Sequence, residues 1–126
     1  MTLNKLVKTY IASGAIAHRR QVKLGAADGV VIQAAAATDA IIGVTDHPGG
    51  VADGERVDVV LLGITDLEFG GTIARGAFVT SDASGRGVAA APATGINNSV
   101  SARAHVSAVS GDIVPVLVIP GQIQGA

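Results

Sequence analysis

Apolar and polar residues alternate along much of this chain, and the alternation predicts short β-strands. In residues 100–107, Ala102, Ala104 and Val106 alternate with polar side chains, which is the spacing of a strand with one buried face. Residues 5–11 alternate more weakly, as expected of a half-exposed strand or an extended arm. Residues 56–62 are almost wholly apolar after Asp58, which predicts a central strand buried on both faces. Further strands are expected at residues 21–24, 30–32, 41–45, 77–80, 88–90 and 113–119.

Turn signals separate these segments. Asp28-Gly29 lies between two β-branched runs, where glycine tolerates the positive φ of a hairpin turn. Residues 92–99 are rich in Pro, Thr, Gly and Asn and predict a surface loop. Helix is expected to be minor, with single turns at most at residues 34–37 and 72–75. Many short strands with turn signals every ~8–12 residues predict an all-β fold, a compact single domain resembling a sandwich or barrel.

Two parts of the chain repeat at one fixed offset, which we call the repeat offset. Residues 14–17 (GAIA) recur as 71–74 (GTIA), and residues 54–59 (GERVDV) recur as 111–116 (GDIVPV), so that position n is matched by position n + 57. Two copies are too few for a solenoid, which needs at least ~3 repeats. The predicted organisation is an N-terminal arm (1–13), a β domain (14–119) with pseudo-repeated halves (14–62 and 71–119), and a C-terminal tail (120–126).

The composition predicts a core of small side chains. Tyr10, Phe69 and Phe78 are the only aromatic residues among 126, and Ala, Val and Ile supply most of the apolar content. Such a core stabilises less per residue than one rich in Leu and Phe, because each side chain removes less area from water. Charged residues make up only 15% of the chain, so we expect apolar surface to remain after folding and to contact other chains.

Basic residues are concentrated at the start of the chain. Five of the nine Lys and Arg residues precede the first acidic residue, Asp28, so residues 1–27 carry +5 and the remainder carries −6 (four bases against ten acids). Two interpretations stay open: a solvated basic face, or an arm that docks on an acidic partner. Nucleic acid is the weaker partner, because the remainder of the chain would be repelled and no aromatic platform accompanies the basic residues.

No pattern in the sequence announces catalysis, a cofactor or a metal. There is no Cys, no phosphate-binding glycine loop, and no pair of His residues at helical spacing. A metal site from Asp46, His47, Asp53 and Glu55 is conceivable but weak, because acidic turn residues are common in β proteins. Ser81, Ser84 and Ser110 lack a nucleophile signature, and no carboxylate pair can be placed from Asp58, Asp66 and Glu68. We therefore predict a protein that is not an enzyme and holds no cofactor or metal.

The sequence also predicts no membrane segment. The longest uncharged run, residues 87–102, is interrupted by Pro, Gly and Asn and falls short of the ~20 apolar residues of a spanning helix. The N-terminus lacks the apolar core and cleavage site of a signal peptide.

Two stretches resemble the capsid cement, or head decoration, proteins of tailed bacteriophages. Residues 71–88 read GTIARGAFVTSDASGRGV, which is similar to the family's G-x-I-x-x-G-x-x-V-x-x-D-x-x-G pattern. Residues 110–118 read SGDIVPVLV, similar to its closing strand. The likeness extends over roughly residues 14–119; the basic segment 1–24 and Asn97-Asn98 depart from the pattern.

The resemblance implies a non-enzymatic protein of the virion, on the outer capsid surface, assembled in the host cytoplasm. Its partners would be the major capsid protein and two further copies of itself in a homotrimer, and it would clamp neighbouring capsid subunits and stabilise the expanded head. The candidate capsid-contact residues are Lys5, Val7, Lys8, Tyr10, Arg19, Arg20 and Lys23.

Two other classes of protein stay open. A carbohydrate-binding or adhesive β module on a virion or cell surface would also be all-β, although such modules usually present aromatic platforms. A small hydrolase or metal-dependent enzyme would require a clustering of His and Asp that the sequence does not announce.

Overall fold

The computed structural model describes residues 5–125, and within that range it is all-β with no helix. Accordingly, this part of the chain contains no helix long and apolar enough to cross a membrane. The single helical turns expected at residues 34–37 and 72–75 do not form. The nine strands are β1 (Lys5–Ala12), β2 (Gln21–Leu24), β3 (Val30–Gln33), β4 (Ile41–Thr45), β5 (Arg56–Glu68), β6 (Phe78–Ser81), β7 (Gly87–Ala89), β8 (Asn97–Ala104) and β9 (Ile113–Gln124).

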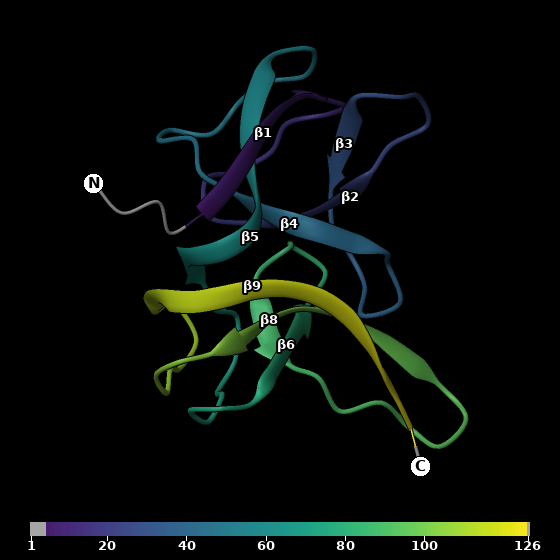
Figure 1. Cartoon of the computed structure of the whole chain (residues 1–126), viewed down its shortest axis with the longest axis vertical. Helices are drawn as coiled ribbons and strands as arrows, with labels where there is room; N and C mark the ends of the chain where they lie inside the picture. Colours follow the sequence, from purple (N-terminus) through teal and green to yellow (C-terminus); the bar gives the residue numbers. More distant parts are fainter. Residues whose placement is uncertain (1–4, 126) are drawn as a thin grey trace.

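All nine strands belong to one continuous sheet that folds into two units. The strand order is β1-β3-β2-β4-β5-β9-β8-β6-β7, and an additional β1–β5 pairing closes the first five strands into a barrel. Figure 1 shows the two units one above the other, with β1 to β5 in the upper unit and β6, β8 and β9 in the lower one. The predicted all-β, barrel-like single domain is confirmed.

The repeat of the sequence is also a repeat of structure. Strands β2 and β6 begin at Gln21 and Phe78, and β5 and β9 begin at Arg56 and Ile113, so both pairs of strands are separated by the repeat offset. The local strand order is also the same, β3-β2-β4-β5 in the first unit and β7-β6-β8-β9 in the second. The pseudo-repeated halves are therefore confirmed.

Equivalent turns are held by equivalent hydrogen bonds. The Ala52 N–H donates to the Glu55 carboxylate at 2.6 Å, and at the matching positions of the second unit the Val109 N–H donates to the Asp112 carboxylate at 3.0 Å. Each acid thus holds the turn that leads into the last strand of its unit. The two acids differ in length but make the same contact.

Strand β5 belongs to both units. Its first half pairs with β1, with Tyr10 opposite Val57, and its second half pairs with β9, with Leu67 opposite Val114. These two pairs are related by the repeat offset. The second half of β5 therefore occupies the position in the second unit that β1 occupies in the first. An isolated parallel bridge between Phe69 and Gly87 brings the second unit toward closure.

The predicted N-terminal arm over residues 1–13 needs correction. Residues 5–12 form β1, which pairs antiparallel with β5 and parallel with β3. Because β1 closes the barrel, this segment is an integral strand and not an arm that lies on a partner. Residues 1–4 lie outside the described residues.

The C-terminal part of the chain also differs from expectation. Strand β9 continues to Gln124 and pairs with β8 as far as Asn97, which places residues 97–99 in a strand and not in a surface loop. The two strands form a ribbon that runs to the lower right in Figure 1. The described part of the expected C-terminal tail, residues 120–125, is therefore largely part of the sheet.

Two small hydrophobic clusters form the core. One is centred on Tyr10, Val22 and Val59 in the first unit, and the other on Leu67 and Phe69 near the junction and in the second unit. Most of their members are Val, Ala and Ile, as the composition predicts. Leu62 breaks the expectation that residues 56–62 are buried on both faces, because its side chain points outward.

Candidate interaction surface

The structure gives the seven predicted contact residues very different environments. Lys5 is partly exposed, and its Nζ lies 3.2 Å from Asp46 Oδ2. Val7 is 43% exposed. Lys8 is exposed, and its Nζ lies 5.1 Å from the centre of the Tyr10 ring.

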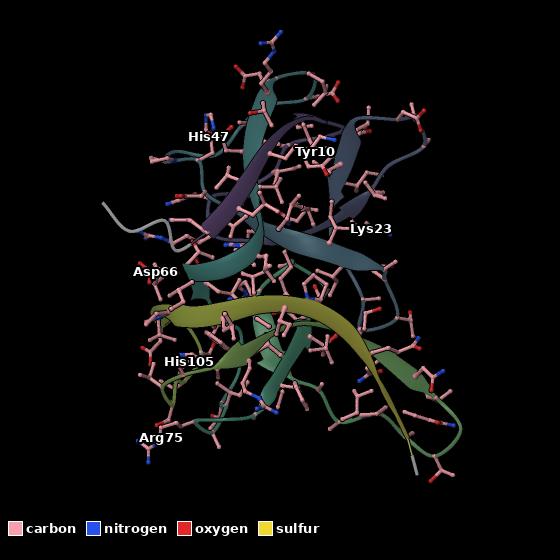
Figure 2. All side chains as sticks on the ribbon, in the orientation of Figure 1. Tyr10, Lys23, His47, Asp66, Arg75 and His105 are labelled. Carbon is pink, nitrogen blue, oxygen red and sulfur yellow. The ribbon has the colours of Figure 1, made fainter. Side chains whose placement is uncertain are left out.

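Tyr10 has to be removed from the set of contact residues. Its side chain is only 8% exposed and belongs to the hydrophobic cluster of the first unit. Figure 2 shows it inside the upper unit, between β1 and β3. An aromatic ring in that position stabilises the barrel and cannot also lie against another protein.

Arg20 is engaged within the chain. Its Nη2 donates to Glu68 Oε2 at 3.2 Å, and its Nη1 donates to the Ser84 carbonyl at 3.0 Å. Glu68 ends β5 and Ser84 lies in the turn after β6, so this guanidinium ties the start of β2 to the second unit. Its role is structural, which corrects the expectation of a free cation at this position.

Lys23 is likewise paired, with its Nζ 3.0 Å from Asp39 Oδ1. Burial acts to raise the pKa of Asp39, but the Ala35 N–H, Lys23 and the Ala36 N–H together hold that pKa below its ordinary value. The carboxylate therefore stays ionised and keeps its ion pair with Lys23. Of the predicted cluster of Arg19, Arg20 and Lys23, Arg19 alone has no ion pair among residues 5–125.

The apolar surface expected from the composition includes a stripe across the outside of the sheet, at a position that the sequence did not predict. Leu6 lies opposite Leu62, and Ile64 lies opposite Leu117, so these side chains share one face of neighbouring strands. Leu6 and Leu62 are 59% and 50% exposed. The stripe ends at Phe78, whose opposite residue on β8 is Arg103. We define the outer stripe as Leu6, Leu62, Ile64, Leu117, Ile119 and Phe78.

The alternation that produces the outer stripe is visible in the sequence. Leu62 and Ile64, like Leu117 and Ile119, are separated by one residue, as side chains on one face of a strand are. Side chains that alternate with a period of two define the two faces of a strand, but the alternation does not show which face is buried. The face that carries Val116 and Val118 enters the core, and only the tertiary structure shows that the other apolar face is left outside.

Two charged groups lie along the outer stripe, Arg103 between Leu117 and Phe78 and Asp66 beside Ile64. Arg103 lies over the Phe78 ring, with Cζ 4.5 Å from the ring centre, and it has no carboxylate partner among the described residues. Asp66 follows Ile64 on the same face of β5 and has no cation paired with it in that range. Figure 2 shows Asp66 at the left margin of the molecule, near the junction of the units.

His18 lies in the loop before β2, where its Nδ1 accepts a hydrogen bond from the His47 N–H at 3.0 Å. Burial, with Arg19 as the next contribution, holds the pKa of His18 below its ordinary value. Asp46 and Asp66 act in the opposite direction but do not outweigh burial. The neutral imidazole is therefore the form that the fold prefers.

The three acids among the four residues weighed as a metal site have other partners. Asp46 pairs with Lys5, Glu55 accepts from Ala52, and Asp53 accepts from the Gly14 N–H at 2.7 Å. Across residues 5–125, no three His, Asp or Glu side chains gather as metal ligands would.

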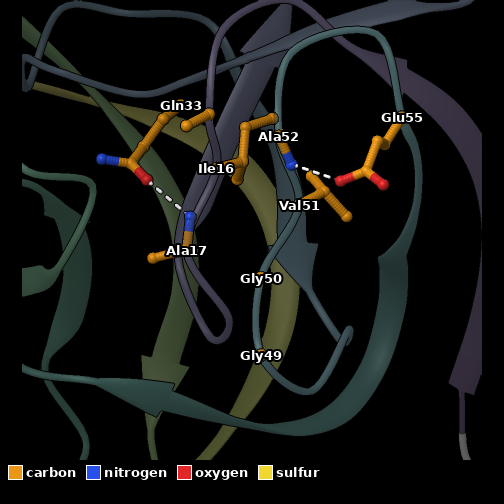
Figure 3. A pocket seen from close by; sticks show the side chains of 9 residues that line it. Ile16, Ala17, Gln33, Gly49, Gly50, Val51, Ala52 and Glu55 are labelled. Carbon is orange, nitrogen blue, oxygen red and sulfur yellow. Dashed lines mark hydrogen bonds between the residues drawn. The ribbon is translucent and has the colours of Figure 1, made fainter.

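An open hollow of about 580 Å³ lies beside the loop that follows β4. Figure 3 shows its two main polar side chains already engaged, Gln33 with the Ala17 N–H and Glu55 with the Ala52 N–H. The rest of the lining is Ala, Gly, Ile and Val. The side-chain oxygens of Gln33 and Glu55 accept hydrogen bonds that hold the neighbouring loops.

The fold is similar to that of a solved phage structure. The N base of head fiber gp8.5 of bacteriophage phi29 matches with a TM-score of 0.67 at 19% sequence identity. The match covers 90% of this chain and 93% of that chain. The two share a fold over nearly their full lengths, and the all-β fold implied by the resemblance is thereby confirmed. No protein-family model matches the chain, and no curated protein matches it.

Proposed function

We propose that this chain is a structural protein of a phage virion that binds the outer surface of the capsid. The observation that supports it most is the likeness, over 90% of the chain, to the phi29 protein, which is described as the N base of a head fiber. The exposed outer stripe adds to the proposal, because apolar surface of this kind usually marks contact with other chains.

In the proposed role, the protein clamps neighbouring major capsid subunits as a homotrimer and needs no catalysis. A molecule that binds the assembled, expanded shell and not its disrupted form stabilises the shell by mass action. Each contact can be weak, because one trimer bridging several subunits attaches with a high effective concentration. Lys8 and Arg19 are the contact cations that we retain, since neither is ion-paired within the described chain.

A carbohydrate-binding module is the weaker alternative, because the aromatic rings are not arranged as a platform. Tyr10 and Phe69 are buried, and Arg103 lies over the ring of Phe78. Phe78 is 37% exposed, so a single partly open ring is present among the described residues, and a platform of several stacked rings is not.

The test compares stripped phage heads with heads re-decorated by the full chain. We expect decorated heads to release DNA at a higher temperature, with a smaller gain at high salt, because exposed charge contacts weaken as the Debye length shrinks. The variant K8E/R19E should bind less well, whereas K5E, which alters an internally paired cation, serves as the matched control. Equal release temperatures with and without the protein would remove the clamping role.

A further inference from the structure

The last part of β9 has an unpaired backbone edge. In its first half β9 lies between β5 and β8, but residues 121–124 pair with β8 alone. The Gly125 N–H donates to the Ile96 carbonyl, next to β8, at 2.8 Å. Because successive residues of a strand direct their backbone groups to opposite sides, the N–H and C=O of Gln122 and Gln124 face away from β8. In the part of the chain that the structure describes, no strand pairs with that edge.

This edge is accessible and carries no charge. Residues 119–125 read IPGQIQG and contain no Lys, Arg, Asp or Glu. Pro120, Gly121, Gln122 and Gln124 are exposed. Natural sheets commonly protect such edges with charged side chains or with proline, and Pro120 protects this one only where it begins. The segment after Pro120 is therefore open to a further strand.

An apolar hollow lies on the outer face of the same segment. It has a volume of about 260 Å³ and is lined by Phe78, Ile119 and Ile123 together with other residues of β6, β8 and β9. Gly121 is part of this lining, and a Cβ at that position would meet nothing within 4 Å. Since side chains two residues apart share a face, Gly121 leaves a gap between the side chains of Ile119 and Ile123.

We infer that the free β9 edge of one copy pairs antiparallel with the β9 edge of a second copy across a two-fold axis. Gln122 lies opposite Gln122 of the second copy, so that the N–H of each donates to the C=O of the other. The Gln124 N–H donates to the Pro120 carbonyl of the second copy, and proline needs no N–H for this contact. The pairing goes beyond the proposed function, because it joins copies of the chain and needs no capsid.

The side chains along the edge favour a second copy as the occupant. In this register Ile123 of the second copy lies opposite Gly121, at a distance where side chains on one face of a sheet meet. It therefore fills the gap at Gly121, and the two-fold axis repeats the contact, because an isologous interface uses the same patch on both copies. With no charge along residues 119–125, two identical strands meet without repulsion.

Pairing also extends the sheet where it has the fewest strands. After β9 separates from β5, β8 and β9 continue as a two-stranded ribbon, which Figure 1 shows extending away from the rest of the molecule. A two-stranded ribbon by itself is only marginally stable in water, whereas three or more strands with an apolar face are more stable. Two ribbons joined along β9 form one continuous sheet.

The first experiment measures the mass of the full chain by sedimentation up to millimolar concentration. The natural chain should reach twice the mass of Gln122→Pro, which lacks the N–H at the centre of the contact and keeps the pairing with β8. This variant should raise the dissociation constant about 10-fold or more, because each copy loses a hydrogen bond. Gln122→Ala is the matched control, since it keeps the N–H, and should change the constant less than about 2-fold. Circular dichroism checks that both variants are folded. Equal masses of the natural chain and Gln122→Pro at every concentration would overturn the inference.

Disulfide formation tests the register without proline. This chain has no Cys, so a single introduced Cys can cross-link only two copies. Opposite residues that exchange hydrogen bonds have Cα atoms about 5.5 Å apart, within the range of about 4.4–6.8 Å that disulfides span. Gln122→Cys should therefore form a covalent dimer under mild oxidation. Gln124→Cys is the matched control on the same edge, because its counterpart lies more than about 10 Å away. Equal cross-linking of the two variants would contradict the pairing.

Binding to phage heads, measured in parallel, distinguishes a second copy from a capsid strand. If Gln122→Pro has the same mass as the natural chain but no longer binds heads, the edge pairs with the capsid and the inference is wrong. A chain that pairs through β9 and does not bind heads supports the inference and removes the proposed function alone.

Discussion

Positions 19 and 76 occupy the same turn in the two units, and they meet the same backbone requirement with different residues. Gly76 has φ of 89°, and Arg19, its counterpart in the first unit, has φ of 61°. Left-handed backbone of this kind costs an L-residue roughly 1–2 kcal/mol, whereas glycine adopts it freely. Arg19 is thus a strained residue among the described non-glycine positions, and its strain follows from the repeated turn.

We expect Gly76→Ala to lower the free energy of unfolding by about 1 kcal/mol. A Cβ at position 76 would meet nothing within 4 Å, so the loss reports backbone strain and not a clash. Gly121→Ala is the control, since that site is equally open but has no positive φ. Urea unfolding measures both variants. Equal stabilities would show that the turn at position 76 relaxes at no cost.

His18 makes the stability depend on pH. Its pKa in the folded protein lies below the ordinary value because of burial, so the unfolded chain takes up this proton first. The contribution of neutral His18 is fully present above pH ~6.5, the unfolded value, and is lost as the pH falls through the lower folded pKa. We expect the urea midpoint to fall from pH 7.5 to 5, and to fall less in His18→Gln. A parallel decline in both proteins would assign the pH dependence to other groups.

At the level of elements, β1 is the strand on which closure of the first barrel depends. It supplies Tyr10 and Ala12 to the core and covers the edges of both β3 and β5. Without it, two strand edges and a hydrophobic cluster would be open to water and to other chains.

Deleting residues 2–12 should therefore abolish cooperative unfolding of the first unit and cause aggregation. Deleting residues 2–4 is the control, because it leaves every described pairing of β1 in place. Circular dichroism and gel filtration distinguish the two results. If the protein without residues 2–12 is a soluble monomer with an unchanged melting temperature, then the segment is an arm and not an integral strand.

For the whole molecule, the sharing of β5 predicts that the two units unfold together. Leu67 lies in the half of β5 that pairs with β9, yet the same strand also closes the first barrel through its other half. Leu67→Ala should cost about 2–5 kcal/mol, as large-to-small core substitutions do, and should lower the melting temperature of both units equally. Calorimetry should show one transition with equal calorimetric and van't Hoff enthalpies. Two separate transitions would mean that β5 frays between the units.

The sequence by itself determined the strand content, the internal repeat and the small-residue core. These properties follow from local patterns: a period of two for strands, Gly and Asp at turns, and the scarcity of aromatic residues. The sequence also located most of the strands, because their ends coincide with turn residues. It placed residues 5–11 in a strand or arm and could not choose between these, because the choice depends on a pairing with residues far away along the chain.

Only the tertiary structure decided which faces are buried and which charges are free. The alternation around Leu62 and Leu117 fits either face toward the core, and the curvature of the whole sheet selects one. Arg20 and Lys23 look like free cations in the sequence, but folding brings Glu68 and Asp39 beside them. Lys8 and Arg19 have no such acid within the described chain. These outcomes depend on contacts between distant residues, which local patterns of hydrophobicity and charge do not specify.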